Sequence, residues 1–119
     1  MLFLEYPPCS TCKKANKWLD DHNICYTARH IKDENPSYEE LKHWLDISDL
    51  PVKKFFNTSG LLYKSLNLKE KLPSMSIEEQ LQLLETDGML VKRPILVTDE
   101  GLILVGFKEA EWESGLSGQ

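Results

Sequence analysis

The sequence has no long hydrophobic run, no excess of positive charge and few histidines, and each absence excludes a class of protein. No apolar run approaches the ~18 residues of a membrane-spanning helix, so we expect no membrane association. Lys and Arg number 14 against 19 Asp and Glu, and the net charge of -5 argues against direct nucleic acid binding, which requires a basic surface. The three histidines, His22, His30 and His43, do not form the spaced pair of a zinc finger.

The first residues, from Met1 to Tyr6, contain no basic segment and only a short apolar one, so they do not read as a signal peptide. We therefore expect a cytoplasmic protein, in which permanent disulfides are rare because the compartment is reducing. A length of 119 residues suits a single domain with its own hydrophobic core. The 41 % hydrophobic and 28 % charged residues are typical of a globular chain.

Two cysteines, Cys9 and Cys12, lie between a predicted strand and a predicted helix. The apolar residues 2–6 predict the strand, and apolar side chains at helical spacing predict a helix over residues 10–21. The first turn of a helix has unpaired N–H groups and the positive end of the helix dipole, which favour a thiolate. Because one helical turn separates the cysteines, their sulfurs can come close enough to form a disulfide. The pattern predicts thiol chemistry with a nucleophile and a resolving thiol.

Other interpretations of the cysteines stay open at this point. A zinc site would need two more ligands, and Cys25 is the only other cysteine, so no bound metal is expected. The pair could also be inert and buried. Cys25 falls inside a second predicted strand, residues 24–31, where we expect it to pack in the core or at an edge. Lys13 and Lys14 either face solvent or add to the positive field at the thiolate.

The middle of the chain carries helix-start signals in place of strand patterns. Ser37 and Glu40 fit a capping box, in which the Ser and Glu side chains each bond a free backbone N–H, and so do Ser76 and Glu79. Residues 35–88 are therefore predicted to be an all-helical insertion. Two shorter helical pieces are expected within it, at residues 51–56 and 61–66, on either side of the turn at 57–60.

The end of the chain predicts a β-hairpin and a last helix. Strands at residues 95–98 and 102–105 are joined by Asp99-Glu100-Gly101, a helix follows over 107–113, and the tail 114–119 is expected to fray. The order of elements indicates a thioredoxin-like α/β fold with a mixed sheet of about four strands. The core would be 1–34 and 89–116, with the helical insertion between the second strand and the hairpin.

Pro94 opens the third predicted strand of this core. Proline lacks a backbone N–H, so it is tolerated only at the start or edge of a strand. A cis peptide bond before Pro94 would be one way to bring this backbone against the cysteine loop.

Three stretches together resemble the ArsC/Spx family over nearly the whole chain. They are Pro7-x-Cys9-x-Thr11 before a basic helix, Asn57-Thr58-Ser59-Gly60, and Lys92-Arg93-Pro94-Ile95 before the hairpin. The resemblance implies a thioredoxin-like fold with a helical insertion and a cis Arg93-Pro94 bond. The family holds arsenate reductases that use glutathione and glutaredoxin, Spx regulators that bind the RNA polymerase α subunit, and uncharacterised small members, to which this chain is most similar.

The resemblance also implies roles for single residues. Cys9 matches the catalytic cysteine of the reductases and Arg93 an arginine that binds the oxyanion, with Thr11 as a further anion-binding residue. A planar guanidinium suits an anion, although Arg93 could instead be a surface or interface charge. Two further family arginines are missing, because Asn57 and Gly106 hold their places. Lys92 and Lys108 would compensate only in part.

A cysteine at the place of Cys12 is absent from the glutathione-dependent reductases and present in the Spx regulators. We therefore predict a thiol–disulfide redox protein in which Cys9 is the nucleophile and Cys12 resolves it. Its substrate would be arsenate, a related oxyanion or a protein disulfide. No cofactor would be bound, and glutathione with glutaredoxin, or thioredoxin, would supply electrons. The alternative is a Spx-like, redox-responsive transcriptional regulator that binds the RNA polymerase α subunit; a third is the same fold without the chemistry.

Overall fold

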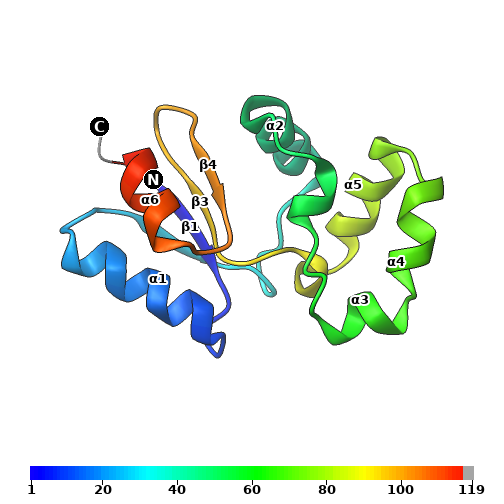
Figure 1. Ribbon diagram of the computed structural model, residues 1–119, viewed down its shortest axis with the longest axis horizontal. Helices are drawn as coiled ribbons and strands as arrows, with labels where there is room; N and C mark the ends of the chain where they lie inside the picture. Colours follow the sequence, from blue (N-terminus) through cyan, green and yellow to red (C-terminus); the bar gives the residue numbers. More distant parts are fainter. Residues whose placement is uncertain (117–119) are drawn as a thin grey trace.

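The computed structural model describes residues 1–116 and builds them around a sheet of four strands, β1 (Leu2–Glu5), β2 (Thr27–His30), β3 (Ile95–Val97) and β4 (Ile103–Val105). Their order across the sheet is β2-β1-β3-β4. β1 is parallel to β2 and antiparallel to β3, and β3 is antiparallel to β4. The predicted thioredoxin-like α/β fold with a mixed sheet is confirmed (Figure 1).

The two faces of the sheet pack against different parts of the chain. Successive side chains of a strand point to opposite faces, so Phe3 and Leu96 lie on one face while Leu4 and Ile95 lie on the other. α1 (Ser10–Asp21) and α6 (Glu109–Leu116) cover the first face. They bury Trp18, Leu19 and Trp112 there.

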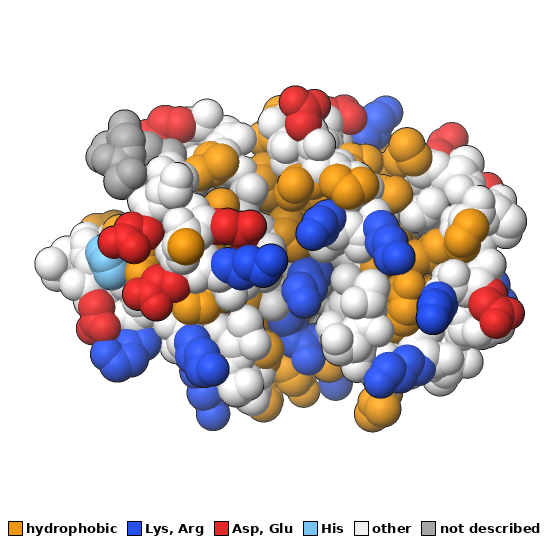
Figure 2. Space-filling view, viewed as in Figure 1, with side chains coloured by type: hydrophobic (Ala, Val, Ile, Leu, Met, Phe, Trp, Pro, Cys, Tyr) orange, Lys and Arg blue, Asp and Glu red, His pale blue; other side chains and the backbone are white. Residues whose placement is uncertain are grey.

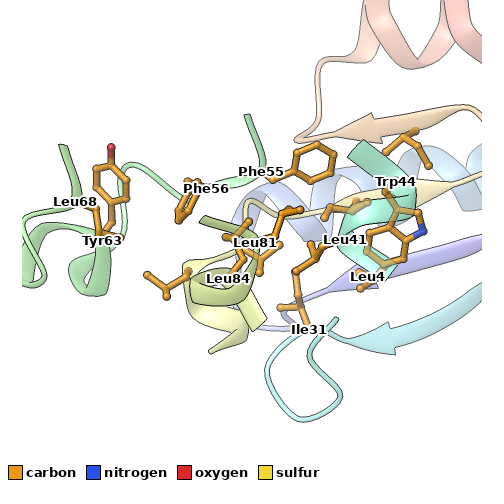
Figure 3. Close-up of a cluster of buried hydrophobic side chains, with 14 of the residues drawn as sticks. Leu4, Ile31, Leu41, Trp44, Phe55, Phe56, Tyr63, Leu68, Leu81 and Leu84 are labelled. Carbon is orange, nitrogen blue, oxygen red and sulfur yellow. The ribbon is translucent and has the colours of Figure 1, made fainter. Parts of the chain in front are cut away.

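The other face packs against the segment between β2 and β3. Its elements are α2 (Tyr38–Ser48), η1 (Val52–Phe55), α3 (Leu61–Ser65), α4 (Leu68–Lys71), η2 (Leu72–Ser74), α5 (Ile77–Thr86) and η3 (Gly88–Leu90), where η marks a 3-10 helix. One continuous cluster of buried side chains joins this segment to Leu4 and Ile31 (Figure 3). The insertion is thus held against the sheet by apolar packing.

Both predicted capping boxes are present. Ser37 Oγ accepts from the Glu40 N–H at 3.2 Å, and Glu40 Oε1 accepts from the Ser37 N–H at 3.0 Å. Ser76 and Glu79 make the same pair of bonds at 3.1 and 2.9 Å. Arg29 also donates to both Glu40 oxygens, at 2.6 and 2.8 Å, and so ties the start of α2 to the sheet.

The prediction for Cys25 is wrong. The second strand begins at Thr27, and Cys25 lies before it with an exposed side chain. The neighbouring Ile24 and Tyr26 pack against the α1 side of the core, so the side chain between them points outward. The strand is shorter than predicted because it pairs with β1, whose first residue, Leu2, lies opposite Thr27.

Two other differences concern helices. α4 was not predicted, and it forms because Leu68 and Leu72, one turn apart, are both buried. The last helix continues to Leu116, through residues that we expected to fray, and the rest of that tail, 117–119, lies outside the described residues. Within residues 1–116, no helix has the length and apolar character needed to cross a membrane.

Candidate active site

Cys9 is the N-cap residue of α1. The chain leaves β1 and turns at Tyr6-Pro7-Pro8, where the Cys9 N–H donates to the Tyr6 carbonyl at 2.9 Å. Cys9 Sγ then accepts a hydrogen bond from the Cys12 N–H at 3.4 Å. The half-buried thiol therefore takes up a free N–H at the positive end of the helix, the position at which a thiolate is stabilised.

Cys12 lies one turn further along and is fully buried. Its Sγ accepts from the Tyr6 N–H at 3.5 Å, and both cysteines are free thiols in this structure. The two thiols differ in burial: Cys9 is partly exposed, whereas Cys12 has no exposed surface.

The structure brings Arg93 to the same place. Its guanidinium carbon lies 5.0 Å from the centre of the Tyr6 ring, and the Arg93-Pro94 peptide bond is cis, as the resemblance implied. Nε and Nη1 of Arg93 are buried and have no hydrogen-bond partner within the described part of the chain. Buried donors without partners are costly, so this guanidinium is suited to an anionic group that approaches Cys9.

The two thiols have opposite pKa shifts. Burial works to raise the pKa of Cys9, but hydrogen bonds from Cys12 and the positive guanidinium of Arg93 outweigh it and lower the pKa below the ordinary thiol value. Burial raises the pKa of Cys12 to about 12, and the adjacent Cys9 adds to the rise. Of the two thiols, Cys9 is therefore the one that ionises more readily.

A cleft of about 830 Å³ opens in front of Cys9. Besides Arg93, four lysines line it, namely Lys53, Lys54, Lys92 and Lys108, against the single acidic residue Glu111. Figure 2 shows Lys and Arg side chains gathered in the middle of this face, between the sheet half and the helical half of the molecule. A protein with net charge -5 thus has its reactive thiol in a locally basic cleft.

The other predicted site residues lie around this cleft. Thr11 lines it, and so do Asn57 and Gly106, the places where the resemblance puts the two missing arginines. Lys13 and Lys14 are exposed, and neither is among the groups that shift the Cys9 pKa, so the positive field comes from Arg93 and the helix start. No cluster of three or more His, Cys, Asp or Glu side chains that could hold a metal occurs in residues 1–116.

Three residues of the site were not predicted from the sequence. Lys53 and Lys54 lie on η1, and Tyr6 supplies both a ring to Arg93 and an N–H to Cys12. The adjacent lysines after Pro51 were a visible signal of a charged surface, but nothing in the sequence says that η1 faces Cys9.

Comparison with known proteins shows what the chain as a whole is similar to. The chain is 54 % identical over 113 residues to an uncharacterized protein, YusI, of Bacillus subtilis, covering 95 % of each chain. It is 34 % identical over 111 residues to the regulatory protein MgsR of the same organism, covering 93 % of this chain and 86 % of that one.

A solved structure shows the same fold. The crystal structure of an ArsC family related protein from Bacteroides fragilis superimposes with a TM-score of 0.91 at 62 % identity, over 95 % of this chain and 94 % of the other. The sequence model described as the ArsC family matches residues 4–114, from the first strand into the last helix. With the fold and family motifs in place around one cleft, this chain belongs to the ArsC family.

Proposed function

We propose that this protein is a cytoplasmic thiol–disulfide oxidoreductase in which Cys9 is the nucleophile and Cys12 is the resolving thiol. One observation carries the proposal: a half-buried Cys9 thiol caps α1, and a fully buried Cys12 lies one turn away. An accessible thiol of low pKa beside a buried partner is the arrangement that exchanges disulfides with another molecule.

In the first step, the Cys9 thiolate attacks one sulfur of a substrate disulfide. A new bond forms between Cys9 Sγ and that sulfur, the substrate S–S bond breaks, and the other substrate sulfur leaves as a thiolate that takes up a proton. Arg93 stabilises the attacking thiolate, and it lies where it could also stabilise the leaving one.

In the second step, Cys12 attacks Cys9 Sγ. Once Cys9 is in a mixed disulfide it carries no negative charge, so one cause of the high pKa of Cys12 is removed and its thiolate forms more readily. A Cys9–Cys12 disulfide forms and the second substrate thiol leaves. The substrate gains two electrons, the protein loses two, and an external thiol such as glutathione or thioredoxin returns them.

Trapping the intermediate tests this assignment. The Cys12→Ser variant should accumulate a mixed disulfide on Cys9 when incubated with bis(2-hydroxyethyl) disulfide, because nothing resolves it. The wild-type protein should end as an internal disulfide with no adduct. Intact mass and peptide mapping distinguish the two products.

Cys25→Ser is the matched control, because Cys25 is exposed but lies away from the cleft and does not line it. That variant should behave as the wild type does. An adduct that stays on wild-type Cys9, or an oxidised Cys25 in place of the Cys9–Cys12 disulfide, would contradict the proposal.

Reduction of arsenate or a related oxyanion is the second substrate class that the site favours, because Arg93 has unpaired donors beside Cys9. The Cys9 thiolate would attack arsenic(V) and displace water. Cys12 would then attack Cys9 Sγ, so that arsenic leaves as arsenite with two electrons and the same internal disulfide remains. Because the cleft has one arginine and not three, we rank arsenate reduction second. If the protein releases arsenite while thioredoxin is oxidised, and Cys9→Ser does not, arsenate reduction would rank first.

A regulatory role is the competing class, and the similarity to MgsR favours it. In this proposal, oxidation of Cys9 and Cys12 would change the affinity of the protein for the RNA polymerase α subunit, as the Spx resemblance implies. Capture of the purified α subunit is to be measured with reduced and with oxidised protein. Absence of binding in both states removes this role.

A further inference from the structure

Two backbone hydrogen bonds fix which side of β4 faces β3. The Gly106 N–H donates to the Pro94 carbonyl at 2.7 Å, and the Thr98 N–H donates to the Leu102 carbonyl at 3.0 Å. In an antiparallel pair, the backbone groups of successive residues point alternately toward and away from the partner strand. The residues bonded to β3 are therefore 102, 104 and 106.

It follows that the N–H and C=O groups of Ile103 and Val105 point away from β3. β4 is the last strand of the sheet, and within residues 1–116 these groups have no hydrogen-bond partner. Ile103 is buried in the core, whereas Val105 is partly exposed. The open part of the β4 edge is therefore its C-terminal end, at Val105.

The two edges of the sheet differ in protection. β2, at the opposite edge, carries Arg29 and His30, and charged side chains commonly protect an edge from pairing. β4 is Ile103-Leu104-Val105, with neither a charge nor a proline. The edge that lacks protection is the one beside the cleft.

A groove follows this edge. It has a volume of about 510 Å³ and lies between β4, the α6 residues Ala110 and Glu111, and the segment that contains Leu50 and Lys54. Lys54, Val105 and Glu111 also line the cleft in front of Cys9. Groove and cleft therefore adjoin, and together they form a channel with an apolar part and a basic part.

The channel leads to the reactive thiol. β1 is antiparallel to β3 and β3 is antiparallel to β4, so β1 and β4 run in the same direction. The C-terminal end of β4, at Val105, thus lies at the same end of the sheet as the turn from β1 to Cys9. A strand added to the edge of β4 would extend past Val105 toward Cys9.

We infer that the β4 edge and the basic cleft together bind an extended, acidic segment of a protein substrate, whose disulfide then lies at Cys9. The inference rests on the proposed exchange function and names its substrate class. The backbone groups of Val105, which lines both the groove and the cleft, would pair with the segment, as when a peptide adds a strand to a sheet. The cleft lysines select acidic side chains, because opposite charges attract at contact and like charges repel.

Peptide disulfides test the charge preference. Each peptide has one cysteine linked to mercaptoethanol and is flanked by Asp and Glu, by Ser, or by Lys. The acidic peptide should oxidise the reduced protein about tenfold faster than the Lys peptide, with a smaller difference at high salt. Lys53→Glu with Lys54→Glu should remove the preference. The control Lys69→Glu, an exposed lysine of α4 that does not line the cleft, should keep it.

Methylated peptides test the β4 edge. An N-methyl group removes one backbone N–H, so methylation at every second position should slow the reaction about fivefold per lost bond, with the intervening positions unaffected. This pattern of alternate positions is the signature of strand addition, and it needs no change to the protein. Methylation effects without alternation, or none at all, would overturn the inference.

The neutral bis(2-hydroxyethyl) disulfide separates the two proposals. If it fails to produce the Cys9–Cys12 disulfide, the exchange function itself is wrong. If it reacts while all peptides react alike, only the docking inference is wrong. Oxidised glutathione that reacts as fast as the acidic peptide, or a stable dimer in sedimentation whose partner covers β4, would also overturn the docking inference.

Discussion

The N-terminus of α1 and the N-termini of α2 and α5 are capped in different ways. α2 and α5 have a serine as N-cap residue, have two acidic residues in their first turn, and complete a capping box. α1 has Cys9 as N-cap residue and no acidic residue in its first turn, and its capping atom is a sulfur. The same physical need, a partner for free N–H groups at a positive helix end, is met by oxygen in the insertion and by a thiol at the cleft.

The difference teaches how this chain separates stability from reactivity. At α2 and α5, carboxylates in the first turn neutralise the positive helix end, and the start of the helix is fixed. At α1, that positive end is left for Cys9, and Arg93 adds a second positive charge. A thiol is a weak hydrogen-bond acceptor, so the N-cap hydrogen bond of α1 is weaker than those of α2 and α5. In return, the thiol of Cys9 ionises more readily.

Converting Cys9 to serine should have the largest effect, because it gives α1 the same cap residue as the other two helices. In Cys9→Ser made together with Cys25→Ser, which removes the exposed thiol, alkylation at pH 7 should fall at least about a hundredfold relative to Cys25→Ser alone, because the remaining thiol, Cys12, is buried and has a raised pKa. The free energy of unfolding should stay the same or rise by up to about 1 kcal/mol, since serine is a preferred N-cap residue. Iodoacetamide kinetics measure the alkylation rate, and calorimetry measures the stability. A fall in stability would mean that Cys9 has a structural role.

Removing the charge of Arg93 should come next. Arg93→Gln should raise the pKa of Cys9, since the guanidinium no longer stabilises the thiolate. The curve of alkylation rate against pH should move to higher pH, and the rate at pH 6 should fall roughly three- to tenfold. Arg93→Lys, which keeps the charge, should move the curve less. An unchanged curve for Arg93→Gln would assign the low pKa to the helix start alone.

Removing the serine caps should change stability and leave reactivity alone. Ser37→Ala should cost about 1–2 kcal/mol and Ser76→Ala about 0.5–1 kcal/mol. Ser37→Ala costs more because Glu40, its partner in the capping box, is also bound by Arg29, whereas the capping box of Ser76 is exposed. Urea unfolding measures both. A change of more than about twofold in the alkylation rate of Cys9 would show that the insertion and the thiol are not independent.

Giving α1 an acidic first turn should have the smallest effect, and it changes both properties in opposite directions. Ser10 is exposed and is the first residue of α1. Ser10→Glu should stabilise the protein by about 0.3–1 kcal/mol through the helix dipole. The same negative charge should raise the pKa of Cys9 and slow alkylation. Ser10→Gln is the neutral control, and equal effects of the two variants would exclude an electrostatic origin.

Much of the fold could be predicted, because its signals are local. The capping boxes join residues three positions apart, and the strand-to-helix junction at Cys9 depends on the neighbouring residues. The position of Cys25 was predicted wrongly because burial in a short strand depends on where the strand begins, and that is set by pairing with β1, which starts opposite Thr27. The site roles of Cys9, Cys12, Arg93 and Thr11 remain predictions, although the structure brings Cys9, Arg93 and Thr11 to one cleft beside Cys12.

The sequence by itself determined that a thiol pair starts a helix, because the order strand, turn and helix is set by residues within one or two turns of each other. Only the tertiary structure decided the surroundings of that thiol. The pairing of β1 with β3 brings Arg93 beside Tyr6, and the packing of the insertion places Lys53 and Lys54 across the cleft. Distances between such residues depend on strand register and on packing between elements, which no short stretch of sequence contains.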